Sequence, residues 1–231
     1  MEEAPCISQI ASILADPKRT AMLWSLMDGS SKSSQDLANL AGLTLASANA
    51  HLARLTGSGL LRTEGQRGQR LFRVAAPDVS AAIDALASTT VASAIRSTPN
   101  VLLSPLAAPP SLRRARLCHG HLGGELAAGL YERMLAAGWV ERHEHRTVVT
   151  LKGTQQLAAL GIFTQALATP LMCDCFDWSQ QYPHLGGALG AGLLQLFLQS
   201  SWISVVSDSR ALVVHDAGQV EISRLAAVEQ S

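Results

Sequence analysis

Apolar residues in the first third of the chain recur at the spacing of amphipathic helices. The stretch "CISQIASILADPKRTAMLWSLMDG" carries this pattern and is interrupted at Asp16-Pro17, a pair typical of a helix N-cap followed by the first helical residue. The pattern therefore predicts two helices, over about 5–14 and 17–27, with Gly29 ending the second.

Two shorter helices follow. "SSQDLANLAG" begins at Ser33 or Ser34 and closes at Gly42, and Thr44 caps a further helix over about 45–56. The pattern then alternates in "LLRTEGQRGQRLFRV", which predicts a two-stranded hairpin around "EGQRGQ". This order of elements is that of a winged helix-turn-helix.

A long helix rich in small residues is predicted over 78–97, and the proline-rich "LLSPLAAPPS" predicts a linker. We therefore expect a DNA-binding and dimerisation domain over 1–98, a linker over 99–111 and a second domain over 112–231.

The second domain contains an internal repeat. His121 and Trp139 are 18 residues apart, as are His184 and Trp202, and both pairs enclose a helical apolar pattern that begins His-Leu-Gly-Gly. Each copy continues into an alternating stretch and a closing helix, which predicts two helix–hairpin–helix units, similar to winged helices, at about 112–162 and 175–228. The expected fold class is mainly α with small β-hairpins (α+β).

Composition limits the class of protein. Of 231 residues, 48% are hydrophobic and 16% charged, with zero net charge, so a nucleic-acid surface has to come from local clustering of arginine. No apolar run is long enough to span a membrane and the N-terminus lacks signal-peptide features, so we expect a cytoplasmic protein without a membrane partner. Its four cysteines, Cys6, Cys118, Cys173 and Cys175, are then expected to be thiols.

Three motifs in the first domain resemble the ArsR family of bacterial repressors: "ILADPKRTAMLWSL", "SQDLANLAGLTLASANAHLARLTGSGLL" and "EGQRGQRLFRV". The resemblance covers about residues 7–90. The second domain resembles the extension of a longer subgroup of these regulators, through Cys118-His-Gly-His121-Leu and Cys175-Phe-Asp-Trp178 ahead of His-Leu-Gly-Gly. The resemblance implies a homodimeric repressor that binds double-stranded operator DNA and responds to a small effector.

Major-groove recognition requires polar side chains near the start of a helix, with cations beside them. Arg67 and Arg70 lie where the tip of a wing enters the minor groove. The complete set of predicted DNA contacts is Thr44, Ser47, Asn49, His51, Arg54, Arg62, Gln66, Arg67, Gln69 and Arg70. The dimer interface is expected along 78–97 and 7–14, where small residues allow close approach and Leu86, Val91 and Ile95 supply contact area.

The resemblance also implies two places where a metal could bind, and neither has the required residues. The first helix of the DNA-reading pair holds no cysteine, and 78–97 holds no histidine. The remaining candidate metal ligands lie in the second domain: Cys118, Cys173, Cys175, His121 and His184, with His119 adjacent to them.

Several chemistries fit these residues. Three thiolates suit trivalent arsenic or antimony, and a cysteine–histidine mixture suits a zinc-like ion. A reversible disulfide from Cys118 to Cys173 or Cys175 is a second interpretation, and small buried hydrophobic residues are a third.

A pocket for an apolar organic effector is the alternative to thiol chemistry. His121 and His184 are expected to begin equivalent helices, and Trp139, Trp178 and Tyr182 are expected to line the seam between the repeats with them.

The predicted function is a DNA-binding regulator, expected to be a repressor that releases operator DNA when a soft metal, metalloid or thiol-reactive signal engages Cys118, Cys173 and Cys175. The alternatives are sensing of an organic molecule and an interaction module that does not bind DNA. Catalysis is not expected, because nothing supplies an oxyanion hole or an orienting acid beside Cys118 and His121.

Overall fold

The computed structural model describes residues 7–66, 68–97, 109–143, 146–172 and 174–227. The chain forms two compact units. The first holds the described residues up to Ala82 with Pro109 and Ser207–Arg210, and the second holds the remainder. The long helix α5 (Pro77–Ser97) starts in the first unit and continues in the second.

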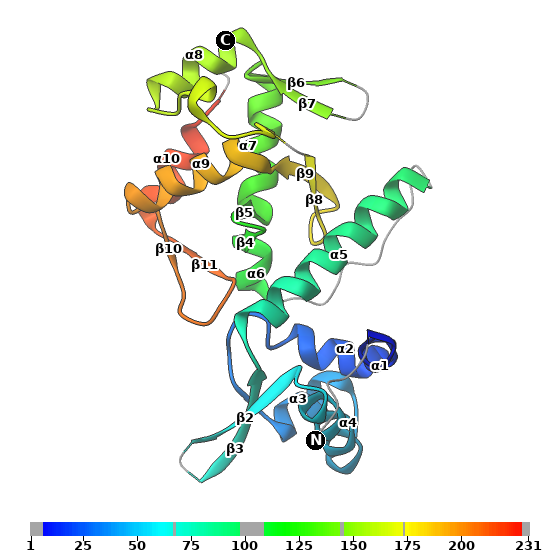
Figure 1. Ribbon diagram of the computed structural model, residues 1–231. Coiled ribbons are helices and arrows are strands. Elements are labelled where there is room, and N and C mark those ends of the chain that lie inside the picture. Colours follow the sequence, from blue (N-terminus) through cyan, green and yellow to red (C-terminus); the bar gives the residue numbers. More distant parts are fainter. Residues whose placement is uncertain (1–6, 67, 98–108, 144–145, 173, 228–231) are drawn as a thin grey trace. The chain divides into compact units, whose positions relative to one another are not determined.

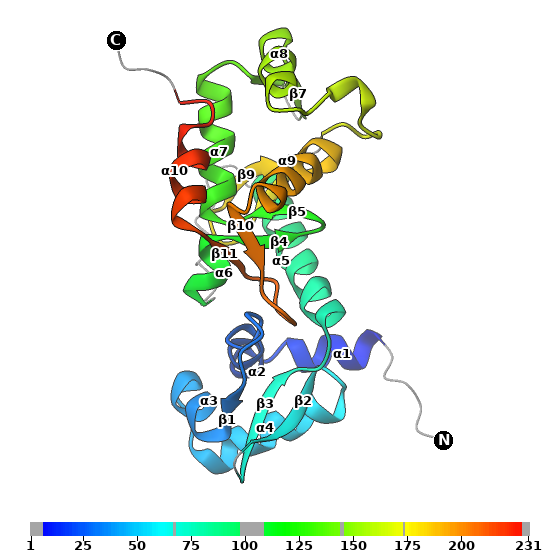
Figure 2. The ribbon, with the colours of Figure 1, turned by 90° about the vertical axis from the view of Figure 1, so that its left-hand side faces the viewer.

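The first unit is a winged helix-turn-helix, as the sequence predicts. Its elements are α1 (Ile7–Leu14), α2 (Pro17–Trp24), β1 (Lys32–Ser33), α3 (Ser34–Ala41), α4 (Leu45–Gly57), β2 (Leu61–Gln66) and β3 (Gln69–Val74). The strands form an antiparallel sheet in the order β1-β3-β2, and the β2–β3 hairpin is the wing (Figure 2).

Capping residues set the helix boundaries in this unit. Asp16 accepts hydrogen bonds from the backbone of the first turn of α2, and Ser33 and Asp36 form a reciprocal capping box on α3. Gly42 ends α3 in the left-handed conformation with φ 62°, and the Thr44 hydroxyl accepts from the first turn of α4.

The second helix is shorter than predicted. The apolar pattern continues to residue 27, but α2 ends at Trp24. The next residues form tight turns, in which Leu26 and Met27 donate to carbonyls three residues earlier. Both side chains are buried, so the apolar pattern there reflects packing in the core and not continued α-helix.

The second unit contains the same order of elements twice, hairpin–helix–hairpin–helix (Figure 1). After α6 (Pro110–Arg114), the first half comprises β4 (Arg116–Cys118), β5 (His121–Gly123), α7 (Glu125–Ala136), β6 (Val140–His143), β7 (Arg146–Val149) and α8 (Leu151–Ala159). After the short η1 (Thr164–Ala166), the second half comprises β8 (Asp174–Asp177), β9 (Tyr182–Leu185), α9 (Gly187–Gln199), β10 (Ile203–Val205), β11 (Leu212–Val214) and α10 (Asp216–Arg224).

Equivalent contacts occur in both halves. The Trp139 carbonyl accepts a hydrogen bond from the backbone of Thr150, and the Trp202 carbonyl accepts one from His215, each at 3.0 Å. The halves also pack crosswise, since α7 lies against β9 and α9 against β5. The origin of this pattern in a duplication stays a prediction.

The prediction that His121 and His184 begin helices is wrong. Both lie in strands, and α7 and α9 begin only at Glu125 and Gly187. The hairpins β4–β5 and β8–β9 were not foreseen because β5 is buried at every residue and β9 at all but its first, so neither strand alternates between apolar and polar residues.

Candidate functional site

The structure leaves one face of α4 open. Among the predicted DNA contacts, Thr44, Asn49 and Arg54 are exposed, while Ser47 is partly buried and donates its backbone N–H to the Thr44 hydroxyl. Ala48, Leu52 and Leu55 fill the opposite, buried face. The helix therefore presents polar side chains away from its own core.

Two of the predicted DNA contacts face groups of the protein itself. His51 Nδ1 lies 3.8 Å from Asp16 Oδ2, and only a fifth of the His51 side chain is exposed. Arg62 bonds to Glu64 at 3.1 Å and to the Ala75 carbonyl at 2.9 Å. The hydrogen bonds of Arg62 hold its guanidinium against the protein, whereas His51 Nδ1 has no hydrogen-bond partner among the described residues.

The wing exposes Gln69 and Arg70, and the Arg70 guanidinium carbon lies 5.2 Å from the centre of the Phe72 ring. The other two predicted tip contacts, Arg67 and the side chain of Gln66, lie outside the described residues. Glu64 accepts from Arg73 as well as from Arg62, so this one acid partly neutralises the base of the wing.

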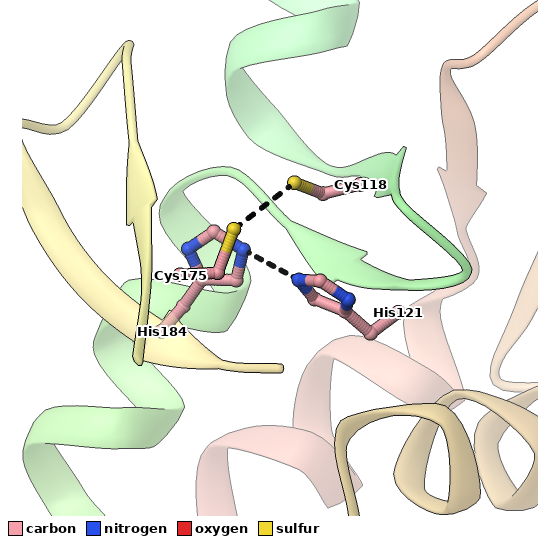
Figure 3. Close-up of side chains that lie close together, drawn as sticks. All are labelled: Cys118, His121, Cys175 and His184. Atoms are coloured by element: carbon pink, nitrogen blue, oxygen red, sulfur yellow. Dashed lines mark hydrogen bonds between the residues drawn. The ribbon is translucent and has the colours of Figure 1, made fainter. Parts of the chain in front are cut away.

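Four potential metal ligands meet in the second unit. Cys118 and His121 are directly opposite each other in β4–β5, and Cys175 and His184 are directly opposite each other in β8–β9. Opposed residues of an antiparallel pair project from the same face, so each hairpin contributes one thiol and one imidazole. Figure 3 shows these four side chains, hereafter the Cys2His2 cluster, directed toward one another.

The cluster is compact and largely buried. The sulfurs of Cys118 and Cys175 lie 3.6 Å apart, and the Nε2 atoms of His121 and His184 lie 3.1 Å apart. All four ligand atoms lie within 4.8 Å of one another. Cys118 and His184 are fully buried, His121 is 4% exposed, and Cys175 is partly buried.

The thiol of Cys118 is held in its protonated form. Its hydrogen bond with Cys175 and its burial raise the pKa of Cys118 to about 12. A buried thiol of this kind is a poor nucleophile on its own, because the thiolate is the reactive species. Burial of a compensating cation would favour the thiolate.

A buried ion network adjoins the cluster. Arg116 bonds through Nε to Asp84 of α5 at 3.0 Å and through Nη2 to Asp177 at 3.0 Å. Its guanidinium carbon lies 4.1 Å from the centre of the Trp178 ring, and the Trp178 indole donates to Asp84 at 2.6 Å. Asp177 also accepts from the backbone N–H of Gly124 at 2.6 Å.

The charges in this network stabilise one another. Burial opposes the charged form of both groups, yet the Arg116 guanidinium keeps the pKa of Asp177 below its ordinary value, and Asp177 and Asp84 raise the pKa of Arg116. Sequence patterns did not indicate Arg116 or Asp84. The arginine within "ARLC" is a weak signal at best, because its carboxylate partners are 32 and 61 residues away.

The three aromatic residues predicted to line an organic-ligand pocket between the repeats have other surroundings in the structure. Trp178 is held in the ion network, Trp139 is buried in the core, and Tyr182 packs edge-on against Tyr131. A small apolar hollow between α7 and α9 is lined instead by Leu122, Ala127, Leu130, Leu185, Gly190, Leu193 and Phe197. The third predicted thiolate ligand, Cys173, lies outside the described residues.

The first unit defines a protein of the winged helix-turn-helix class, and the second adds a buried Cys2His2 cluster. The chain is similar over nearly its whole length to an uncharacterised HTH-type transcriptional regulator of Bacillus subtilis, with 29% identity over 223 residues that cover 95% of this chain and 96% of the relative. No family model matches.

Solved structures resemble the first unit. NolR of Sinorhizobium fredii is 26% identical with a TM-score of 0.33, over 36% of this chain and 81% of that one. A homodimeric winged helix-turn-helix domain of Mycobacterium bovis Mb0332, a possible ArsR-family regulator, is 21% identical with a TM-score of 0.35, over 42% and 87%.

The winged helix-turn-helix of the first unit and the HTH-type name of the Bacillus subtilis relative agree with the fold that the predicted resemblance implies. The name of the Bacillus subtilis relative, a transcriptional regulator, agrees with the class of protein that the sequence predicts. Among the described residues, no helix is both long enough and apolar enough to cross a bilayer.

Proposed function

We propose that this protein is a DNA-binding transcriptional regulator, acting as a repressor that releases its operator when a signal engages the cysteines of the second unit. The observation that carries the proposal is the occurrence, in one chain, of a helix-turn-helix with an open recognition face and a buried thiol–imidazole cluster. Similarity to a transcriptional regulator along nearly the full chain supports the same conclusion.

DNA is bound by α4 and the wing in this proposal. Asn49 addresses a base edge in the major groove, Thr44 and Ser47 contact phosphate, and Arg54 adds a cation at the far end of the exposed face. Arg67 and Arg70 reach the minor groove from the wing tip.

The protein acts as a homodimer on a pseudo-palindromic site. No residue of α1 is buried, and Ile7 is 88% exposed. The helix therefore offers an apolar surface to a second copy of the chain. On α5, Leu86 is 58% exposed and available for the same purpose, whereas Val91 is buried within its own chain.

Val91 is therefore better assigned to the core than to the predicted dimer interface. The side chain of Ile95 lies outside the described residues.

The signal is a soft metal or metalloid ion, or a thiol-reactive compound, at Cys118 and Cys175. Arg116 lies two residues before Cys118, and Asp177 lies two residues after Cys175, so both strands that carry the thiols also hold the ion network. Because Asp84 of this network belongs to α5, a shift of either strand acts on the helix that leads to the first unit.

Selection from a random pool of DNA duplexes, followed by fluorescence anisotropy on the enriched sequence, tests DNA binding with the full chain. The double variant Arg67→Ala/Arg70→Ala should weaken binding at least about tenfold and lower the salt slope by about one unit for each phosphate that is no longer bound. Arg142→Ala, on an exposed strand of the second unit, is the matched control. Unchanged affinity and slope in the wing variant would rule out the wing contacts, and no enriched sequence would rule out the regulator.

A further inference from the structure

We infer that the Cys2His2 cluster binds one divalent, four-coordinate metal ion of the zinc class, with Cys118, His121, Cys175 and His184 as its four ligands. The inference rests on the proposed function only in treating the cluster as the place where the signal arrives. It narrows the ligand from a soft metal, metalloid or oxidant to a single type of ion.

The sulfur–sulfur and nitrogen–nitrogen distances match two edges of a tetrahedron, and the sulfur–nitrogen distances are at most 4.8 Å. Zinc with ordinary bond lengths and tetrahedral angles separates two thiolates by about 3.8 Å and two imidazole nitrogens by about 3.3 Å. The corresponding distances are 3.6 Å between the two sulfurs and 3.1 Å between the two Nε2 atoms. Small outward movements of four side chains are enough to admit the ion.

Charge balance favours a divalent ion. Binding breaks two S–H bonds, releases two protons to solvent, and forms two metal–sulfur and two metal–nitrogen bonds with neutral imidazoles. The two thiolates, each with a charge of −1, neutralise the +2 charge of the ion. The resulting centre has no net charge, which suits a site where three of the four ligands are at most 4% exposed.

Other ions fit less well. A trivalent metalloid prefers three thiolates, and with two it would leave a net positive charge buried. A monovalent copper ion would leave a net negative charge and makes less use of imidazole. Magnesium and calcium prefer oxygen ligands and higher coordination numbers, which this cluster does not supply.

The cluster is also closed. Four protein side chains complete a tetrahedral shell, so no position remains for substrate water, as it would in a catalytic zinc site. Each hairpin supplies half of the shell, so occupancy ties β4–β5 to β8–β9. An ion at this position therefore acts as a link between the two halves of the second unit.

Cobalt(II) titration of the reduced, chelator-treated full chain tests the inference, with zinc(II) as competitor. We expect one ion per chain, the visible absorption of tetrahedral cobalt with a thiolate-to-cobalt charge-transfer band, about two protons released per ion, and displacement by zinc. Octahedral cobalt spectra, or no charge-transfer band, would overturn the inference.

Variants assign the ligands. Cys175→Ser and His184→Gln should each lower cobalt affinity at least about a hundredfold, more than the loss typical of an outer-shell residue. His143→Gln, an exposed histidine of β6, and Cys6→Ser are the matched controls and should bind as the parent does. Because the ligand variants are open to folding defects, His184→Cys provides a gain of signal: it keeps four ligands and should raise the charge-transfer intensity by about half, from two thiolates to three.

Cys173→Ser distinguishes the proposed four-ligand site from a site made of three thiolates. The inference predicts unchanged cobalt binding in this variant. Tight binding of arsenite that requires Cys173 and ignores His121 and His184, with weak cobalt binding, would instead establish a three-thiolate site. A disulfide between Cys118 and Cys175 that survives treatment with a reducing agent would also overturn the inference.

The DNA assay distinguishes this inference from the proposed function. If cobalt binds as expected but DNA affinity is equal with and without it, the metal site stands and the signalling part of the proposed function fails. If DNA binding is sequence-specific and no cobalt binds, the metal site fails and the regulator stands.

Discussion

The hairpins β4–β5 and β8–β9 perform the same task with different connections. Both place a cysteine opposite a histidine, at Cys118–His121 and at Cys175–His184. The first pair is joined by two residues, His119 and Gly120, with positive φ angles of 49° and 88°. That combination is typical of a tight hairpin turn whose twist matches the strands.

The second connection is longer and has an additional role. It carries Trp178 and Ser179, and with Asp177 at the end of β8 it surrounds the Arg116 guanidinium of the first hairpin. The comparison shows that strand register pairs one cysteine with one histidine in each hairpin, whatever the connection between the strands. The connection between β8 and β9 does not set this pairing, and its residues belong instead to the ion network that includes Asp84.

Replacement of Arg116, the arginine of the first hairpin that bonds to Asp177 of the second, should have the largest effect on stability. Arg116→Met leaves Asp84 and Asp177 buried without their cation, so we expect a loss of about 3–5 kcal/mol in the free energy of unfolding. Urea denaturation followed by circular dichroism measures it, and Arg142→Met on an exposed strand is the control. A loss of under about 1 kcal/mol would show that the network does not stabilise the second connection.

Glycines in the closing helices test whether the halves are equivalent beyond their hairpins. A Cβ on Gly153 would lie 1.9 Å from the Trp139 carbonyl oxygen, and one on Gly218 would lie 2.1 Å from that of Trp202. Gly153→Ala and Gly218→Ala should each cost about 1–3 kcal/mol of stability, because backbone has to move.

Thermal unfolding of both glycine variants measures this cost, with Gly57→Ala as the control because a Cβ there meets nothing within 4 Å. Similar losses would support equivalent packing in the two halves. Tolerance at one glycine alone would show that the resemblance ends at the order of elements.

The turns themselves provide the smallest and most local test. Gly120→Ala places a side chain at a φ of 88° and should destabilise the first hairpin by about 1 kcal/mol. Gln181→Gly, at a φ of 53° in the second connection, should leave stability unchanged or raise it slightly. Chemical denaturation of the two variants in parallel checks the opposite signs, and equal losses would contradict the difference between the connections.

Local chemistry made the first unit predictable. Asp16, Ser33, Gly42 and Thr44 each mark a helix boundary by a hydrogen bond or backbone angle that depends on a few neighbouring residues. For the same reason the winged helix-turn-helix could be predicted from the order of elements. By contrast, the end of α2 at Trp24 depends on core packing, which the apolar pattern does not distinguish from a longer helix.

The candidate site could be predicted only in part. The sequence indicated Cys118, Cys175, His121 and His184 as candidate ligands, but not their pairing, because the largely buried strands β5 and β9 give no alternating pattern from which a register could be predicted. It also assigned Trp178 to a ligand pocket. The partner that holds this indole, Asp84, is 94 residues away in the chain, and no local pattern links the two.

The two glycines under the tryptophan carbonyls have a consequence for evolution. Gly153 and Gly218 are each the third residue of their helix, where the backbone of the preceding hairpin leaves no room for a methyl group. Purifying selection should therefore remove nearly every amino-acid replacement at either position. An aligned set of orthologous genes should show glycine at both positions even where the surrounding helix has diverged.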